Sequence, residues 1–527
     1  MAHAIQYRRL RAPREHGQSL IVPPLADALD LLASNVTLAR SEYHRVMIGG
    51  MSLPDLRGQA RHALLADAYR YSRSYWEGVR PPVTDAPIVL SGHQPELFHP
   101  GVWFKNFVLS AIGERAGANT INLVIDNDTV VAPTVRVLRS REYVETVPLD
   151  AAADELPYEE RAILDPALLA TFAARVDRPL ARHLWEYVAL LHTDHGAPRL
   201  GQVVAAARHC LEAEYGLRTL ELPLSRVCDA PAFARFTLHL LGNLPDFHTT
   251  YNDALREYRH ANHVRSHSHP VPELVREGEW WEAPFWIWSD SDPRRRPLFA
   301  AFQQHELILS DRESLRFTLP LPGGSVEPGT LAAWLSARFG GIKIRPRALI
   351  TTMYARLVLG DLFLHGIGGA KYDELTDALI SRCFQITPPQ FMTVTATMQL
   401  APVNPASTAA ELRRIEHDLH ELPYHPETFL SDEQRADPAI AALAQEKLAW
   451  VQQQLPKGER RERHQAITRL NAQLRQQLEP VATQLEQRRE ALAAQLDLER
   501  LLSSREYWFC TFDETLPQEL RQLASFA

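Results

Sequence analysis

The chain has 527 residues and a mass of 59.6 kDa, which is too large for one ordinary hydrophobic core, so we expect two or three substructures. Hydrophobic residues make up 45% and charged residues 23%, which is typical of a globular protein. The net charge of -8 and the pI near 6.3 leave no broad basic face, so we expect no nucleic-acid partner.

The N-terminal residues Met1–Leu20 hold four arginines but lack the apolar segment that a secretory signal needs. No apolar run in the chain is long enough to span a bilayer. We therefore expect a cytoplasmic protein without a membrane partner. The cysteines form no CxxC pair and no zinc-knuckle spacing, so we interpret them as reduced thiols: Cys210, Cys228, Cys383 and Cys510.

Apolar residues recur at helical steps from about Leu25 to Gly78, which predicts an N-terminal helical segment over residues 1–85. A β-branched strand, Ile88–Leu90, follows, then a polar loop, Ser91–Gly101, and an apolar helix from Val102 to about Arg115. A second strand, 121–125, comes after that helix. This order predicts one half of a parallel sheet, in a Rossmann-like core over residues 86–405.

Polar groups follow both strands, at the edge where open α/β sheets bind ligands. The helix after the first loop offers unpaired N–H groups to an anion, so we predict a nucleotide or carboxylate site. His93 and His99 flank that loop, and each either contacts phosphate or simply caps the helix or bonds to backbone. Gly92 and Gly101 permit a tight path, and Lys105 lies one helical turn further on.

Asp126 and Asp128 stand two residues apart at the end of the second strand, with Asn127 between them. Such carboxylates suit magnesium or a ribose. Alternatively, the three residues form a turn through bonds between side chains and backbone.

A mixed insertion is expected at about residues 150–340. Its tryptophan-rich segment Trp280–Trp288 and the following Pro293–Phe299 predict a β-hairpin with a turn at Ser289–Pro293, and the indoles either stack on a base or sugar or pack in the interior. The run His260, His263, His267 and His269 has ligand-capable residue types, but no acidic or cysteine pattern completes a metal site, so we assign no metal ligands. Helices are expected at Ala167–Ala174, Ala181–Leu191 and Gly201–Tyr215.

A glycine-rich turn interrupts the stretch Leu349–Leu400, and we expect a helix to enter it and Ala370 or Lys371 to open the next one. Exposed N–H groups of the glycines, together with nearby cations, predict a second anion-binding edge. The residues concerned are Arg345, Arg347, Gly366, Gly368, Gly369 and Lys371.

Residues 406–510 are predicted to form an α-helical coiled-coil hairpin, with a tail over 511–527. Pro456 and Gly458 separate two arms, and Pro480 is expected to kink the second arm. The seam is either packed within the arm or forms a homodimer, and the sequence leaves both open. Its apolar residues are Ile467, Leu474, Leu478, Val481, Leu485 and Leu492.

The chain resembles the bacillithiol biosynthesis cysteine-adding enzymes from about Pro87 onward. That family has a Gly-Gln-Gln or similar loop, a Leu-Phe, a Gly before a lysine-bearing helix, an Asp-His-Asp after the next strand, and later an Arg-Pro, a Gly-Gly-Pro and a Tyr. The matching residues are Gly92-His93-Gln94, Leu97-Phe98, Gly101, Lys105, Asp126-Asn127-Asp128, Arg345-Pro346, Gly368-Gly369 and Tyr372.

The resemblance implies a Rossmann-like core with connecting insertions, a coiled-coil arm, an adenine-nucleotide site for ATP or ADP, and the joining of cysteine to a glucosaminyl-malate. His93 stands where glutamine is usual, Asn127 replaces histidine and Ala370 replaces proline. These departures motivate a second hypothesis, an inactive relative that binds a small molecule or assembles through its coiled coil.

Our leading hypothesis is a ligase-type enzyme that acts on a small-molecule substrate, with magnesium as a further candidate cofactor. Candidate catalytic residues are His93, Gln94, His99 and Asp128. Candidate substrate-binding residues are Gly92, Lys105, Asp126, Asn127, Arg345, Arg347, Tyr354, Gly368, Gly369, Lys371 and Tyr372.

Overall fold

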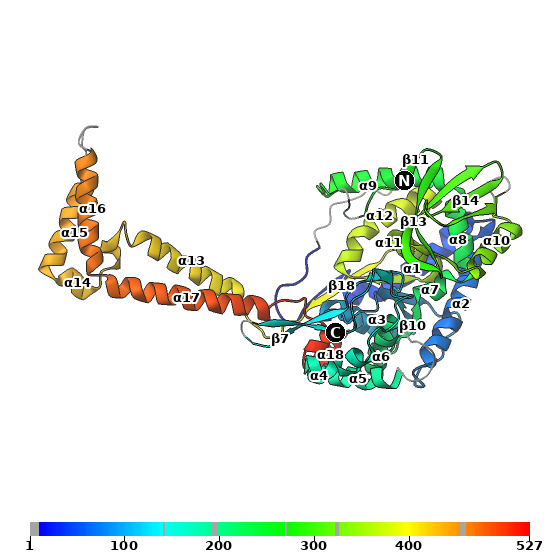
Figure 1. The fold of residues 1–527 in the computed structure, drawn as a ribbon, viewed down its shortest axis with the longest axis horizontal. Coiled ribbons are helices and arrows are strands. Elements are labelled where there is room, and N and C mark those ends of the chain that lie inside the picture. The colour runs from blue at the N-terminus through cyan, green and yellow to red at the C-terminus, as the bar shows by residue number, and fades with distance from the viewer. Residues whose placement is uncertain are drawn as a thin grey trace. The chain divides into compact units, whose positions relative to one another are not determined.

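The computed structural model describes residues 10–140, 143–191, 199–266, 268, 271–321, 326–453 and 460–526, and the chain folds into two compact units (Figure 1). The core unit comprises the described residues of Met1–Val137, Val144–Met398 and Arg505–Ala527. The arm unit comprises those of Leu138–Tyr143 and Gln399–Ser504. Arg505 thus belongs to the core unit, although the sequence placed it in the arm.

The core unit is of the mixed α/β class, with a central sheet in the order β1-β18-β17-β4-β5-β10. Five strands run parallel, and β1 pairs antiparallel with β18 at one edge. From β4 the chain adds β5 and β10 on one side and later β17 on the other, so the strand order reverses between β4 and β17. The strands are β1 (Gln18–Val22), β4 (Ile88–His93), β5 (Asn119–Val124), β10 (Leu220–Pro223), β17 (Leu362–His365) and β18 (Met392–Thr397).

Helices cover the faces of this sheet, which is why every residue of β5, β10, β17 and β18 is buried. The helix between β4 and β5 is α3 (Pro100–Ala116), and it packs against β4, β5 and β18. His99 caps α3, Pro100 occupies its first turn, and Gly117 ends it with a φ of +61°. The chain therefore starts α3 directly at the carboxyl edge of the sheet.

The predicted N-terminal helices are present as α1 (Ala28–Glu42) and α2 (Leu53–Arg73), joined through short strands β2 (Met47–Ile48) and β3 (Met51–Ser52). The expected insertion helices appear as α4 (Pro166–Val176), α5 (Pro179–Leu191) and α6 (Leu200–Glu214), and three more follow β10: α7 (Leu224–Cys228), α8 (Pro231–Gly242) and α9 (Leu244–Ala261). Short strands precede α4: β6 (Thr129–Val130), β7 (Thr134–Leu138), β8 (Val144–Pro148) and β9 (Leu156–Pro157).

A second, antiparallel sheet contains the predicted tryptophan-rich hairpin, whose strands β12 (Trp280–Ser289) and β13 (Asp292–Gln303) pair directly. Its turn is shorter than expected, because only two residues separate the strands. One hydrophobic core joins both sheets, since Leu90 of β4 and Phe285 of β12 belong to the same buried cluster. The remaining strands are β11 (Arg276–Glu277), β14 (Glu306–Ser310), β15 (Arg316–Pro320) and β16 (Ile342–Pro346).

The glycine-rich turn differs from its prediction. The segment entering it is strand β17, not a helix, and the next helix, α12 (Ile367–Phe384), begins before Ala370. Leu362, Phe363 and Leu364 form a short buried strand because they fill the sheet between β4 and β18. Gly368 and Gly369 thereby lie in the first turn of α12. Other elements here are α10 (Pro328–Phe339), α11 (Ala348–Tyr354), the π-helix η4 (Ala355–Leu359) and α18 (Leu516–Leu523).

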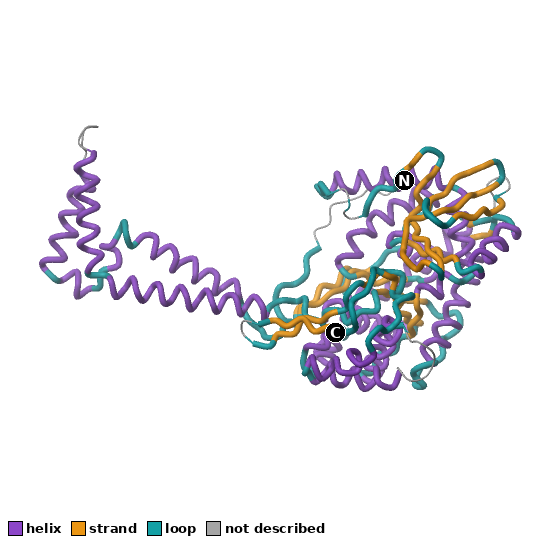
Figure 2. The backbone as a smooth tube through the Cα atoms, in the orientation of Figure 1, coloured by secondary structure: helices purple, strands orange, loops and turns teal. Residues whose placement is uncertain are grey.

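The arm unit consists of helices and connecting loops (Figure 2). Within it, α15 (Pro438–Gln452) packs on α16 (Arg460–Gln476), and α13 (Pro405–Glu421) packs on α17 (Glu479–Leu502), with α14 (Asp432–Ala436) before α15. The predicted kink at Pro480 is wrong. The helix ends at Gln476, and Pro480 occupies the first turn of α17, where its missing N–H breaks no helix bond. Pro456 and Gly458 lie outside the described residues.

Across the described ranges, no helix has both the length and the apolar character needed to cross a membrane.

Candidate functional site

A cavity of about 910 Å³ lies in the core unit at the carboxyl ends of β4, β5 and β17. Its walls come from the loop after β4, the first turns of α3, the loop after β5, the hairpin of β12 and β13, and the starts of α11 and α12. Arg505, which follows the arm unit in the chain, also lines it. The volume is in the range of small-molecule and cofactor sites.

The structure brings most of the predicted site residues to this one cavity, although they come from three separate parts of the chain. It leaves out Asp126, Arg345 and Tyr354. The predicted residues that line the cavity are Gly92, His93, Gln94, His99, Lys105, Asn127, Asp128, Arg347, Gly368, Gly369, Lys371 and Tyr372.

Asp126 does not share a site with Asp128. Its Oδ1 accepts the backbone N–H of Ser225 at 2.9 Å, and its Oδ2 accepts the Ser225 hydroxyl at 2.5 Å. The side chain is buried, and burial, with a smaller effect from Glu159, raises the pKa of Asp126 to about 7. After β5, the carboxylate of Asp126 therefore lies in the protein interior, whereas that of Asp128 lines the cavity. The two carboxylates cannot bind the same magnesium ion.

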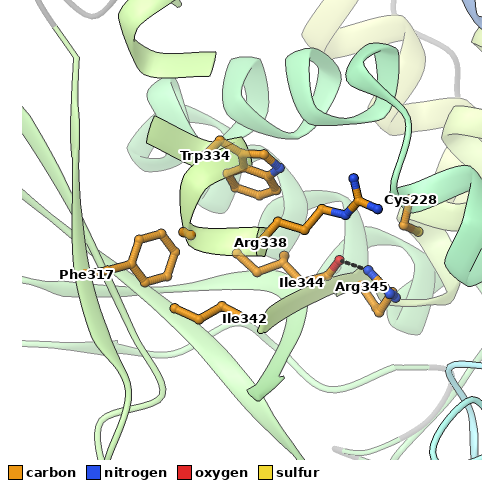
Figure 3. Close-up of a pocket in the computed structure, with 8 residues that line it drawn as sticks. Cys228, Phe317, Trp334, Arg338, Ile342, Ile344 and Arg345 are labelled. Carbon is orange, nitrogen blue, oxygen red and sulfur yellow. Dashed lines mark hydrogen bonds between the residues drawn. The ribbon is translucent and has the colours of Figure 1, made fainter. Parts of the chain in front are cut away.

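Arg345 is committed to a buried ion pair. Its Nε and Nη2 donate to the two carboxylate oxygens of Glu159, both at 2.9 Å. Figure 3 shows Arg345 beside Cys228 at a separate cavity of about 10 Å³, which is scarcely large enough for one water molecule. A bidentate pair of this kind has no free edge for a ligand.

Tyr354 is a core residue. It is 2% exposed, and its ring lies against those of Phe233 and Phe236, with centroids 5.1 and 5.0 Å away. Burial raises the pKa of its phenol far above the ordinary value. Its helical position in α11 faces away from the cavity, which the sequence pattern did not reveal.

Three basic side chains surround the N-terminus of α3, and we call them the α3 cation cluster: His99, Lys105 and Arg505. His99 Nδ1 accepts the N–H of Gly101 at 3.1 Å, and Lys105 Nζ donates to the carbonyl of Gly92 at 2.8 Å. Arg505 Nη2 donates to Thr395 Oγ1 at 2.9 Å.

Positive charge in this cluster is poorly balanced. Burial, reinforced by Arg208, lowers the pKa of Lys105 to about 7, and burial, Arg505 and Lys105 lower the pKa of His99 to about 4. Among the described residues, the only carboxylate paired with the cluster is Glu506, 3.9 Å from Arg505 and mostly exposed. A helix N-terminus is itself a positive dipole end, so cations gathered there favour a bound anion.

Asp128 is a carboxylate of the same cavity, and one amide and one guanidinium hold it in place. Gln94 Nε2 donates to its Oδ2 at 2.9 Å, and Arg295 Nη1 to its Oδ1 at 3.1 Å. The guanidinium of Arg295 also lies 4.4 Å from the ring centroid of Trp286, and that of Arg347 lies 4.2 Å from it. Trp286 therefore organises two arginines at the cavity wall.

Neighbouring groups fix the rest of this wall. Asn127 Nδ2 donates to the carbonyl of Pro346 at 2.8 Å, and Arg347 Nη2 donates to Glu282 at 2.6 Å. Trp288 is fully buried and donates its indole N–H to Glu160 at 3.0 Å, so this tryptophan packs in the interior rather than stacking on a ligand.

Sequence reasoning missed His365 and Asp373, which also line the cavity. His365 ends β17, and its Nε2 contacts Oδ2 of Asp373 on α12. Burial raises the pKa of Asp373, but its contacts with His365 and Arg356 outweigh burial and hold that pKa below its ordinary value. The sequence did contain one signal for His365, because this histidine follows an apolar run and precedes a glycine-rich turn. Arg295 and Arg505 gave none, because their positions depend on contacts between distant segments.

The cavity as a whole favours an anionic ligand. Among the residues that the structure describes, six lysine and arginine side chains line it, against the two carboxylates Asp128 and Asp373. The six are Arg11, Lys105, Arg295, Arg347, Lys371 and Arg505.

Within the described residues, no cluster of histidine, cysteine and acidic side chains could hold a metal ion. His267 and His269 of the histidine run lie outside those residues. No protein-family model matches the chain, and no curated protein matches it.

Proposed function

We propose that this protein is a ligase- or transferase-type enzyme that joins a small amine or thiol to an anionic small-molecule acceptor. The observation that carries the proposal is the cavity at the carboxyl edge of the parallel strands. Lysine and arginine side chains outnumber carboxylates in its described lining, and the α3 cation cluster lies at the start of α3. The resemblance to the bacillithiol family supplies the specific case, addition of cysteine to a glucosaminyl-malate.

The order of the parallel strands supports a Rossmann-like core. Read by their order in the chain, β10-β5-β4-β17-β18 is 3-2-1-4-5, the order of dinucleotide-binding folds. Such folds bind ligands where the strand order reverses, which here is between β4 and β17. His93 ends the first of these strands and His365 the second, and both line the cavity.

The α3 cation cluster would bind the anionic part of the substrate or nucleotide. Because His99 Nδ1 accepts a backbone N–H, the neutral ring carries its proton on Nε2 and can donate it to an anion. Lys105 and Arg505 add charge, and the first-turn N–H groups add directed donors. Asp128, held by Gln94 and Arg295, is the acceptor suited to a substrate amine.

The residues fit the phosphates of ATP or ADP better than they fit magnesium. A nucleotide would supply an activating phosphate group, and the lining cations could hold it. Asp126 faces Ser225 and Asp128 is paired with Arg295, so no carboxylate pair is left for Mg²⁺.

Calorimetric titration with ATP and with ADP, each with and without Mg²⁺, tests the nucleotide part. We expect binding that Mg²⁺ changes little and that Arg505→Met weakens about tenfold or more, through loss of a charge-assisted contact. Arg500→Met is the matched control, because Arg500 is an exposed arginine of α17 that pairs with Asp497. Absence of binding by either nucleotide would remove the nucleotide from the proposal.

The joining reaction is tested separately, by mass spectrometry of incubations with ATP, cysteine and glucosaminyl-malate. A condensed product that depends on the protein is expected. If neither this pair nor other small thiols and amines give a product while anions still bind, the protein is a binding module rather than an enzyme.

The homodimer expected through the coiled-coil seam remains a prediction. Leu474 and Leu478 of the seam are buried together with Leu430, so these residues pack within the arm unit itself. Leu448 and Val451 of α15 are exposed and available to a second copy. Sedimentation of the wild type against Leu448→Glu would show a shift to lower mass only if a dimer uses this face.

A further inference from the structure

Three histidines among the described residues line the cavity, and the charges of the groups next to them differ. His93 and His99 face cations: burial and Lys105 lower the pKa of His93 well below its ordinary value, and His99 is next to Arg505 and Lys105. His365 alone has a carboxylate partner, Asp373. A histidine that must receive a proton needs a neighbour that stabilises the imidazolium, and a carboxylate provides this where cations oppose it.

The Asp373 carboxylate is itself held in place. It is fully buried, and Arg356 Nη1 donates to its Oδ2 at 2.9 Å while Arg356 also pairs with Asp377 at 2.5 Å. Asp373 and Asp377 lie four residues apart on the same face of α12, so the two contacts hold Arg356 against that face. The acid is therefore ionised and oriented before any ligand enters.

The imidazole of His365 is fixed as firmly. Its centroid lies 4.4 Å from that of Phe363 and 5.1 Å from that of Phe391, in an edge-on contact with the latter. While Nε2 contacts Oδ2 of Asp373, the other nitrogen, Nδ1, lies against Gly369 in the first turn of α12. A β-carbon added to Gly369 would stand only 2.7 Å from Nδ1, whereas one added to Gly368 would meet no atom within 4 Å.

We propose that His365 is the catalytic base of the cavity, accepting on Nδ1 the proton of the attacking amine or thiol, and that Asp373 is the positioning residue that holds its Nε2–H. This inference rests on the proposed function. As the nucleophile's lone pair forms the new bond to the acceptor carbon, its proton passes to Nδ1. The acceptor carbon would carry a phosphate supplied by the nucleotide, so the carbon–oxygen bond that breaks leaves its electron pair on inorganic phosphate, and the imidazolium gives the proton to that phosphate.

The first test measures the protonation of the His365 ring and needs no substrate. Nitrogen NMR of ¹⁵N-histidine-labelled protein, with the His365 signals assigned by their loss in His365→Asn, reports which ring nitrogen carries the proton. We expect the Nε2–H form in the wild type and a loss of that preference in Asp373→Asn. A neutral His365 protonated on Nδ1 would overturn the inference, whatever the protein's reaction proves to be.

The second test uses turnover in the mass-spectrometric assay together with ADP binding. His365→Asn should lower kcat by about 10²–10⁴-fold, the usual contribution of a general base, and change ADP affinity less than threefold. Gly369→Ala should lower kcat because it displaces the ring, whereas Gly329→Ala should not, because Gly329 lies in the first turn of α10 with no atom within 4 Å of an added β-carbon and does not line the cavity. Near-normal kcat in His365→Asn, or equal losses of kcat and binding in both glycine variants, would refute the role. A wild type without turnover would instead refute the proposed function, and the NMR result would still stand.

Discussion

Lys105 is a buried amine whose charge state depends on what occupies the cavity. The groups that face it are the Gly92 carbonyl, Arg208 and the two neighbouring histidines His93 and His99, and none of them is an anion. With its pKa lowered to about 7, Lys105 is largely neutral at pH 7.5. A bound anion would raise that pKa, so binding must draw a proton from solution.

Calorimetry of ADP binding at pH 7.5 in buffers of different ionisation enthalpy measures this proton. We expect an uptake of roughly half a proton or more per ligand, and an affinity that declines as the pH rises above about 7. Lys105→Met should abolish the uptake. Buffer-independent heats in the wild type would mean that the anion binds away from Lys105.

Asp126 makes a second prediction at this scale, about stability. Its folded pKa of about 7 exceeds the ordinary value of 3.8, so folding favours its protonated form. Between pH 4 and pH 7 the folded protein then holds a proton that the unfolded chain has released, and the free energy of unfolding falls as the pH rises. Urea unfolding of wild type and Asp126→Asn should show the wild-type advantage shrinking by about 1–3 kcal/mol over this range. A difference independent of pH would contradict the assignment.

Individual side chains were the least predictable part of the site. His93, Lys105 and Asp128 were found from the sequence, because polar residues after an apolar strand share the ligand-binding edge of a sheet. The Asp126 side chain points away from the cavity because it accepts hydrogen bonds from Ser225, and Arg345 is not free to bind a ligand because it pairs with Glu159. Neither partner is near in sequence, so alternating polarity could not separate a ligand-binding acid from a buried one.

At the scale of elements, α3 is the helix whose entry point shapes the cavity. Gly101 in its first turn lets Arg505 and β18 approach, since an added β-carbon would stand 2.3 Å from the carbonyl oxygen of Ala396 and 2.6 Å from the Arg505 guanidinium. Gly58 in α2 is a helical glycine with no atom within 4 Å of that position.

These two glycines give opposite expectations. Gly101→Ala should destabilise the protein by about 1–3 kcal/mol through overpacking and should weaken anion binding by moving Arg505. Gly58→Ala should stabilise it by about 0.5–1 kcal/mol, because alanine is the better helix residue. Thermal unfolding and ADP titration of both variants are the measurements. Equal effects would show that α3 does not approach β18 as described.

Elements were predicted better than side chains, for a physical reason. Strands β4, β5, β12 and β13 were expected because apolar, β-branched or aromatic runs leave few alternatives. β17 was taken for a helix because a run of four buried residues carries no periodicity. The break between α16 and α17 was taken for a kink, because proline at a first turn and proline within a helix look alike in sequence.

At the scale of the whole molecule, the two units have separate hydrophobic interiors. The cluster that joins both sheets belongs to the core unit, whereas the arm unit buries a small one around Leu430, Leu474 and Leu478. A small interior removes less apolar surface from water, so the arm unit should unfold at a lower temperature.

Differential scanning calorimetry should therefore resolve two transitions, with ADP raising only the upper one because the cavity lies wholly within the core unit. Leu474→Ala should lower the first transition and leave the second in place. A single cooperative transition that moves as a whole on adding ADP would contradict the division into independent units.

We propose that three distant stretches of the chain build one anion-binding cavity where the strand order reverses. The decisive measurement is a crystal structure grown with ADP. We expect density for a phosphate within hydrogen-bond distance of Lys105, Arg505 or the first-turn N–H groups of α3. Nucleotide bound outside this cavity, with the cavity itself unoccupied at saturating ADP, would refute the proposal.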